Sequence, residues 1–264
     1  METLAFIKPE WTFPVLLQLG PWRLPVHPVC DVLAYSLGFQ FYLFLRRRAP
    51  GPRLPAEKNA WIFIGGIFGA IAGAKLLAWA EAPTLYWALR NDPHFWFGGK
   101  TIVGGLLGGW AGIETAKWIL GLTNSIGDFC VYPIILGMCI GRIGCFFTGL
   151  SDNTCGLPSS LPWAVDFGDG IPRHPAQIYE IVFLLVLGLV LALCRRRLTA
   201  PGMTFRCFLA AYLAFRFYID FFKPHWTLFG GLSGIQWGCL LGLAACAWSL
   251  MKLFEKTTPE HSHG

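Results

Sequence analysis

Apolar runs of about 20 residues recur along the whole sequence, and they constrain the fold more than any other feature. A run of this length crosses the hydrocarbon core of a bilayer as one α-helix. Hydrophobic residues make up 55% of the 264-residue chain. Charged residues make up 14%, well below the roughly 25% of soluble domains. The sequence therefore predicts an all-α polytopic membrane protein.

The runs predict a bundle of seven transmembrane helices. The spans cover residues 27–45, 60–80, 100–121, 127–148, 176–194, 202–221 and 229–252. The domain layout is an interfacial arm over 1–26, a bundle over 27–252 and a tail over 253–264, with a small head over 150–175 inserted between helices 4 and 5. Tryptophans and prolines in the arm are typical of a segment at the lipid headgroups.

Basic residues predict the orientation of the bundle. The triplets Arg46–Arg48 and Arg195–Arg197 fall on one side, together with Lys252 and Lys256, while the other side has few basic residues. The basic side is expected to be cytoplasmic. The N-terminus and the head are then expected to face outward, and the C-terminus is expected to face the cytoplasm. The net charge of +6 follows from this asymmetry, so no nucleic-acid partner is expected.

Glycines repeat at every fourth position in three of the spans. The stripes are Gly65, Gly69 and Gly73; Gly104, Gly108 and Gly112; and Gly234, Gly238 and Gly242. Small residues at this spacing let helix backbones approach closely in lipid. A tightly packed monomeric bundle is favoured over a dimer interface.

The nine cysteines are scattered, with no CxxC pair and no Cys/His cluster at metal-ligand spacing. The spacing therefore predicts no metal site. Cys145 and Cys155 both fall near the outer surface in this layout, so a disulfide between them is left open.

Charged side chains occur at one depth in six of the spans, in the outer half of the bilayer. They are Asp31, Lys75, Lys100, Arg142, Glu180, Arg216 and Asp220. A charge at the bilayer centre costs about 2.5 to 3.5 kcal/mol, so such residues are functional candidates. Two arginines there suit an anionic headgroup, because a guanidinium binds phosphate through two hydrogen bonds. The alternative is that these residues form ion pairs that only fix helix packing, as Arg216 and Asp220 could at a spacing of four.

Several of these residues lie in segments that resemble the prolipoprotein diacylglyceryl transferase family. They are Gly141-Arg142-Ile143-Gly144, the segment RHPAQIYE from Arg173 to Glu180, Phe215-Arg216 through Phe222, and Gly234 to Gly238. The likeness covers about 27–250. It implies a seven-span inner-membrane enzyme that moves the diacylglyceryl group of phosphatidylglycerol to the lipobox cysteine of a prolipoprotein signal peptide, without metal or organic cofactor.

The resemblance also implies roles for individual residues. Arg142 and Arg216 would hold the lipid phosphate, with Glu180 and Asp220 orienting them. The other predicted substrate-binding residues are Tyr179, Gln177, Lys100 and the glycine pair Gly104 and Gly105. A thiol attacks as thiolate, so a base must accept its proton. His174 and Asp31 are the candidates, although His174 could equally be a structural residue of the head.

The chain departs from the family pattern at several polar positions. Val103 stands where the family has a histidine, Cys145 and Thr148 replace asparagines, Leu150 replaces an acid, and the expected tyrosine falls at Asp31. Three hypotheses follow: a transferase of this family, a divergent non-enzymatic protein that binds or moves phospholipid, and an enzyme with Cys145 as covalent nucleophile.

Overall fold

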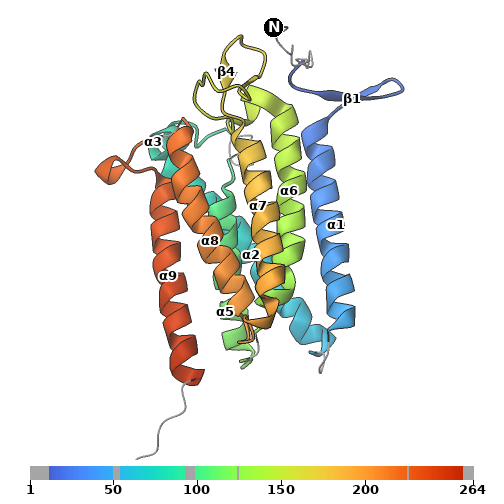
Figure 1. Ribbon diagram of the computed structural model, residues 1–264, viewed down its shortest axis with the longest axis vertical. Coiled ribbons are helices and arrows are strands. Elements are labelled where there is room, and N and C mark those ends of the chain that lie inside the picture. The colour runs from blue at the N-terminus through green and yellow to red at the C-terminus, as the bar shows by residue number, and fades with distance from the viewer. Residues whose placement is uncertain (1–11, 50–53, 93–98, 124, 225, 258–264) are drawn as a thin grey trace, which may run out of the picture. The chain divides into compact units, whose positions relative to one another are not determined.

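The computed structural model describes residues 12–49, 54–92, 99–123, 125–224 and 226–257 (Figure 1). Nearly all of its regular structure is helical, which confirms the all-α class. The start of the predicted arm and the end of the predicted tail, residues 1–11 and 258–264, lie outside the described residues.

Long helices account for most of the described chain. They are α1 (Val26–Arg48), α2 (Ala56–Glu81), α5 (Ile102–Ile119), α6 (Val131–Thr148), α7 (Ala176–Leu193), α8 (Met203–Ile219) and α9 (Gly234–Thr257). Shorter helical segments are α3 (Pro83–Ala88), η1 (Gly127–Cys130), η2 (Gly149–Asp152), η3 (Cys194–Arg196), η4 (Asp220–Phe222) and η5 (Phe229–Gly231).

In the part of the chain that the structure describes, five helical segments are long and apolar enough to cross a membrane, so the chain is a multi-pass membrane protein. They are Val26–Arg48, Ala56–Glu81, Gly127–Asp152, Ala176–Arg196 and Gly234–Leu253. The two remaining predicted spans correspond to α5 and α8. The glycine-rich α5 carries Glu114 and Lys117, and α8 has 17 residues. The count of seven spans therefore stays a prediction for these two helices.

The chain divides into two compact units. The first unit consists of residues 1–41 and 133–186, and the second of residues 42–132 and 187–264. The first unit includes an antiparallel hairpin of β1 (Leu16–Leu19) and β2 (Trp22–Pro25), which lies within the predicted arm. It also includes β3 (Val165–Asp166) and β4 (Pro172–Arg173), which pair within the predicted head.

Small residues bring α1 and α6 together inside the first unit. A Cβ added at Gly137 would lie 3.4 Å from the Ala34 carbonyl oxygen. A Cβ added at Gly144 would lie 2.8 Å from Cys30 Cβ and 3.2 Å from His27 Cα. Because there is no room for a side chain at Gly144, the first turn of α1 lies against the last turn of α6.

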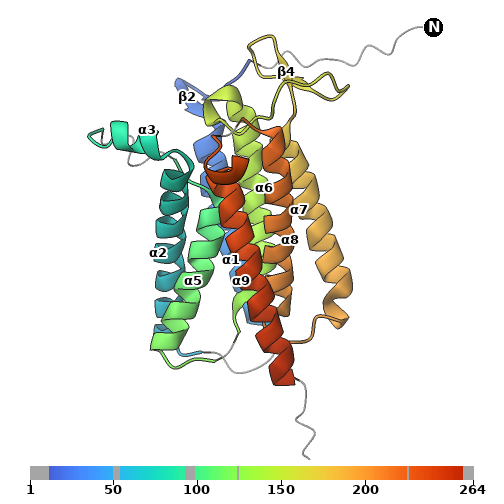
Figure 2. The same cartoon turned by 90° about the vertical axis from the view of Figure 1, so that its left-hand side faces the viewer.

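In the second unit the first two glycine stripes face each other, on α2 and α5, which lie side by side (Figure 2). A Cβ at Gly69 would lie 2.2 Å from the Gly108 carbonyl oxygen, and one at Gly73 would lie 2.3 Å from that of Gly104. The third stripe, on α9, contacts residues of α2, α5 and α8, and α8 runs beside α9 in Figure 1. The predicted helix packing through glycine is confirmed, and the monomeric state stays a prediction.

Asp128 in η1 caps the start of α8. Its Oδ2 accepts a hydrogen bond from the Gly202 amide at 2.6 Å, and its Oδ1 accepts one from the Phe205 amide at 2.9 Å. A carboxylate at a helix N-terminus satisfies free amides and complements the helix dipole. We expect Asp128→Ala to lower the free energy of unfolding by about 1 to 2 kcal/mol, measured by thermal unfolding in detergent. Asp128→Asn keeps one acceptor oxygen and should lose less, and equal losses would contradict this assignment.

Candidate functional site

An ion pair between Arg142 of α6 and Glu180 of α7 is buried in the first unit. Arg142 Nη2 lies 2.9 Å from Glu180 Oε2, and the two residues are 5% and 0% exposed. Both charges lie inside helices that can cross the membrane. Burying either charge alone would be costly, so each stabilises the other in place. The contact is the one expected if Glu180 orients Arg142.

Four further side chains gather beside Arg142. Cys145 Sγ lies 3.8 Å from Arg142 Nη1 and 3.6 Å from His27 Nε2. His27 Nδ1 lies 3.2 Å from Asp31 Oδ2, and His27 Nε2 lies 3.6 Å from Asp152 Oδ1. The predicted site residue Asp31 therefore contacts His27, which was not among the predicted site residues. The sequence feature that could have indicated His27 is its spacing of four residues from Asp31, which puts both side chains on one face of α1.

Gln177, at the start of α7, holds the end of η2. Its Nε2 donates to Thr154 Oγ1 at 3.0 Å, and Thr154 Oγ1 donates to Asp152 Oδ2 at 2.8 Å. Gln177 Nε2 also lies 3.4 Å from Cys155 Sγ. All nine cysteines are free thiols, so the disulfide left open between Cys145 and Cys155 is not formed.

His174 of the predicted head contacts Tyr179, which lies in the first turn of α7. His174 Nδ1 lies 3.1 Å from the Tyr179 hydroxyl, which accepts a hydrogen bond from Trp163 Nε1 at 2.8 Å. The His174 backbone amide donates to the Leu157 carbonyl. These contacts support the structural reading of His174 and leave its catalytic role a prediction.

Arg173, the first residue of the RHPAQIYE segment, closes the loop before α7. Its Nη2 lies 2.6 Å from Asp169 Oδ2, outside the membrane-spanning helices. The hydrogen bond from this guanidinium holds the pKa of the Asp169 carboxyl below its usual range. The pair therefore stays charged down to acidic pH.

The second unit holds the other predicted pair. Arg216 Nη2 lies 3.7 Å from Asp220 Oδ1, and both residues are buried. Asp220 Oδ2 accepts a hydrogen bond from Ser233 Oγ. Ser233 and Gln236 form a reciprocal capping box at the start of α9: Ser233 Oγ accepts from the Gln236 amide, and Gln236 Oε1 accepts from the Ser233 amide. Asp220 thereby ties Arg216 to the start of α9.

Lys100, Gly104 and Gly105 lie at the start of α5, also in the second unit. Lys100 is exposed, and Thr101 Oγ1 caps the helix by accepting from the Gly104 amide at 3.2 Å. Gly104 contacts α2, since a Cβ added to it would lie 2.2 Å from the Gly73 carbonyl oxygen. A Cβ added to Gly105 would lie 3.8 Å from its nearest neighbour, the Ala70 carbonyl oxygen. Among the predicted site residues, the structure pairs Arg142 with Glu180 in the first unit and Arg216 with Asp220 in the second. The convergence of Arg142 and Arg216 stays a prediction.

Comparison with known proteins identifies the family. The sequence profile described as prolipoprotein diacylglyceryl transferase matches residues 14–252. The chain belongs to this family. A relative from Geobacter sulfurreducens is 34% identical over 211 residues, covering 76% of this chain and 80% of its own. One from Nitratidesulfovibrio vulgaris strain DP4 is 32% identical over an alignment of 271 residues, covering 93% and 96%. Both are named phosphatidylglycerol–prolipoprotein diacylglyceryl transferase.

Val103 and Cys145, two positions at which the chain is expected to depart from the pattern of this transferase family, have distinct surroundings. Val103 is 1% exposed and belongs to the apolar core. Cys145 instead lies among polar groups, between Arg142 and His27. Cys145 therefore places a thiol beside the buried ion pair, whereas Val103 places no polar group in its surroundings.

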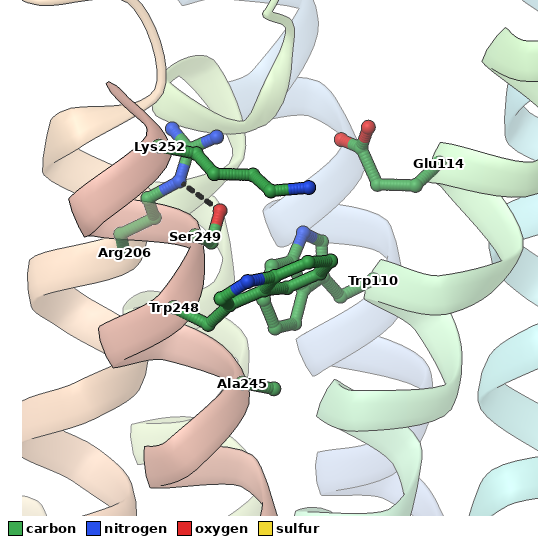
Figure 3. A pocket seen from close by; sticks show the side chains of 7 residues that line it. All are labelled: Trp110, Glu114, Arg206, Ala245, Trp248, Ser249 and Lys252. Carbon is green, nitrogen blue, oxygen red and sulfur yellow. Dashed lines mark hydrogen bonds between the residues drawn. The ribbon is translucent and has the colours of Figure 1, made fainter. Parts of the chain in front are cut away.

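A separate pocket of about 240 Å³ lies in the second unit, between α5, α8 and α9 (Figure 3). Its lining residues are Trp110, Glu114, Arg206, Ala245, Trp248, Ser249 and Lys252. Arg206 Nε donates to Ser249 Oγ at 2.7 Å, and Lys252 Nζ lies 3.7 Å from the centre of the Trp248 ring. The pocket is smaller than the roughly 300 Å³ of typical ligand sites and contains no predicted site residue, so we assign no function to it.

Proposed function

We propose that this protein transfers the diacylglyceryl group of phosphatidylglycerol to the thiol of a lipobox cysteine in a prolipoprotein. The family match over residues 14–252 carries the proposal, because it spans both buried arginine–carboxylate pairs. The names of the relatives state the donor lipid and the acceptor protein. No observation favours the non-enzymatic alternative.

We place the enzyme in the bacterial inner membrane as a monomer with seven spans, α5 and α8 included. Arg46–Arg48 and Arg195–Arg197 lie at the ends of α1 and α7 that would face the cytoplasm, where basic residues are favoured. The N-terminal arm and the head over 150–175 then face the periplasm, where the signal peptide of a secreted prolipoprotein arrives. The tail over 253–264 is cytoplasmic.

In this mechanism Arg142 and Arg216 bind the phosphate of the donor lipid, and Glu180 and Asp220 orient them. The acceptor thiolate attacks the diacylglyceryl carbon that bears the phosphate oxygen. A carbon–sulfur bond forms, the carbon–oxygen bond breaks, and its electron pair leaves with glycerol phosphate. Guanidinium groups fixed beside the phosphate stabilise the charge that develops on this leaving group. The residues proposed to line the substrate cavity are Lys100, Gly104, Gly105, Gln177 and Tyr179.

The proposal is tested in membranes that contain this protein as their only diacylglyceryl transferase. Labelled phosphatidylglycerol and a lipobox peptide should give lipidated peptide, and the same peptide with serine in place of cysteine should give none. Expression should also rescue growth of a bacterium depleted of its own enzyme. Folded protein that yields no product from any lipobox peptide would reject the transferase function.

A further inference from the structure

Three side chains with metal-binding atoms meet where the start of α1 contacts the end of α6. His27 Nε2 lies 3.6 Å from both Cys145 Sγ and Asp152 Oδ1, and the three ligand atoms all lie within 4.8 Å of one another. In tetrahedral zinc sites, ligand nitrogen and sulfur atoms stand about 3.5 Å apart, and nitrogen and oxygen atoms about 3.3 Å apart. The donor atoms are therefore already close to the spacing that a bound ion requires.

Hydrogen bonds from a second layer of residues orient two of the three ligands. Asp31 Oδ2 lies 3.2 Å from His27 Nδ1, so it can hold the proton on that nitrogen and leave the Nε2 lone pair facing Cys145. Thr154 donates to Asp152 Oδ2, which leaves Oδ1 facing His27. A carboxylate on the outer nitrogen of a ligating histidine is a recurrent feature of metal sites.

The charges around the cluster also suit a divalent cation. A thiolate at Cys145 and a carboxylate at Asp152 would together neutralise its two positive charges. Arg142 lies 3.8 Å from Cys145 Sγ, but its own charge is balanced by Glu180 at 2.9 Å. The side chains of His27 and Asp152 are 28% and 22% exposed, which gives a further ligand access to the cluster.

The cysteine spacing and the family resemblance both predicted a protein without metal. From the geometry of this cluster we propose instead that His27, Cys145 and Asp152 bind a divalent transition metal ion of the zinc class, with Asp31 as the residue that positions His27. Three protein ligands leave one tetrahedral position for an exogenous ligand. Resting on the proposed transferase function, we assign that position to the acceptor thiol. A thiol that coordinates such an ion releases its proton to water and remains a thiolate. The thiolate then attacks the glyceryl carbon while the phosphate oxygen departs with the bonding electrons.

Metal analysis of the purified protein tests the site without any activity assay. Wild-type protein and the control Cys246→Ser, altered on α9, should retain stoichiometric zinc. His27→Ala and Cys145→Ser should lose it, and Asp31→Asn should bind zinc about 10-fold more weakly. Thermal unfolding identifies any variant that fails to fold. Equal zinc contents in folded wild-type and Cys145→Ser protein would overturn the proposal.

Cobalt provides a second readout that reports on the thiolate directly. Protein stripped of metal and loaded with Co²⁺ should show thiolate-to-cobalt charge-transfer absorption in the wild type and none in Cys145→Ser. Absence of that band from cobalt-loaded wild-type protein would reject Cys145 as a ligand.

The transfer assay separates the metal site from the transferase function. Loss of transfer on chelation and recovery with Zn²⁺ would support both. Full transfer by metal-free wild-type protein that is lost in His27→Ala would overturn the metal site and make His27 the base. Zinc bound as described, with no transfer to any lipobox peptide, would keep the site and reject the transferase function.

Discussion

Arg142→Ala should lower the rate of diacylglyceryl transfer by about 10²- to 10³-fold, as removal of a fixed donor to a developing oxyanion does. The side chain is buried and its charge is matched by Glu180 at 2.9 Å. Removing it also leaves the Glu180 carboxylate buried without this partner, at a cost of about 3 to 5 kcal/mol of stability. The measurements are the initial rate with labelled phosphatidylglycerol and the unfolding temperature of the same preparation.

A charge-removing double variant separates phosphate binding from helix packing. In Arg142→Met/Glu180→Leu neither charge of this pair is left buried alone, so much of the stability should return. Transfer should not return, because no guanidinium remains to bind phosphate. Arg142→Lys keeps the positive charge but cannot form the bidentate hydrogen bonds of a guanidinium with phosphate, so it should be only partly active. Arg197→Ala, at an exposed arginine after α7, is the matched control and should be fully active. A double variant with wild-type transfer would show that the pair serves packing alone.

The sequence was sufficient to identify Arg142 and Glu180 as charged residues inside membrane-spanning segments. Such residues are functional candidates, because a charge inside an apolar run is costly. The sequence also predicted close helix packing through the glycine stripes, because the spacing of small residues is a local pattern that one helix displays by itself. The ion pair between Arg142 and Glu180 could not be predicted in the same way. Nothing in the sequence says which of several buried carboxylates lies against Arg142; the packing of α6 against α7 decides it.

The cluster around His27 could not be predicted from the sequence for a similar reason. His27 and Cys145 are 118 positions apart, and neither stands in a recognisable metal-binding spacing. Their contact depends on Gly144, where no side chain separates α1 from α6. By contrast, the Ser233–Gln236 capping box at the start of α9 is a local sequence pattern, so it could have been predicted from the sequence alone.

Gly108→Ala should destabilise the second unit by about 3 kcal/mol, at the upper end of the usual cost of overpacking. An added Cβ would lie 2.2 Å from the Gly69 carbonyl oxygen and 2.8 Å from Gly73 Cα. Both atoms belong to the α2 backbone, which cannot rotate away as a side chain can. The helices must therefore separate, and every contact along their shared glycine stripe weakens.

Gly109→Ala, at the next position on α5, is the matched control. Its added Cβ would lie 3.5 Å from Ala70 Cβ, an ordinary van der Waals contact. Alanine favours the helix over glycine by about 1 kcal/mol, so this variant should unfold at or slightly above the wild-type temperature. The two variants carry the same added methyl group one residue apart, and only the atoms of α2 that it meets, and their distances, differ. Equal unfolding temperatures in the same detergent would mean that α2 and α5 are not in contact along this stripe.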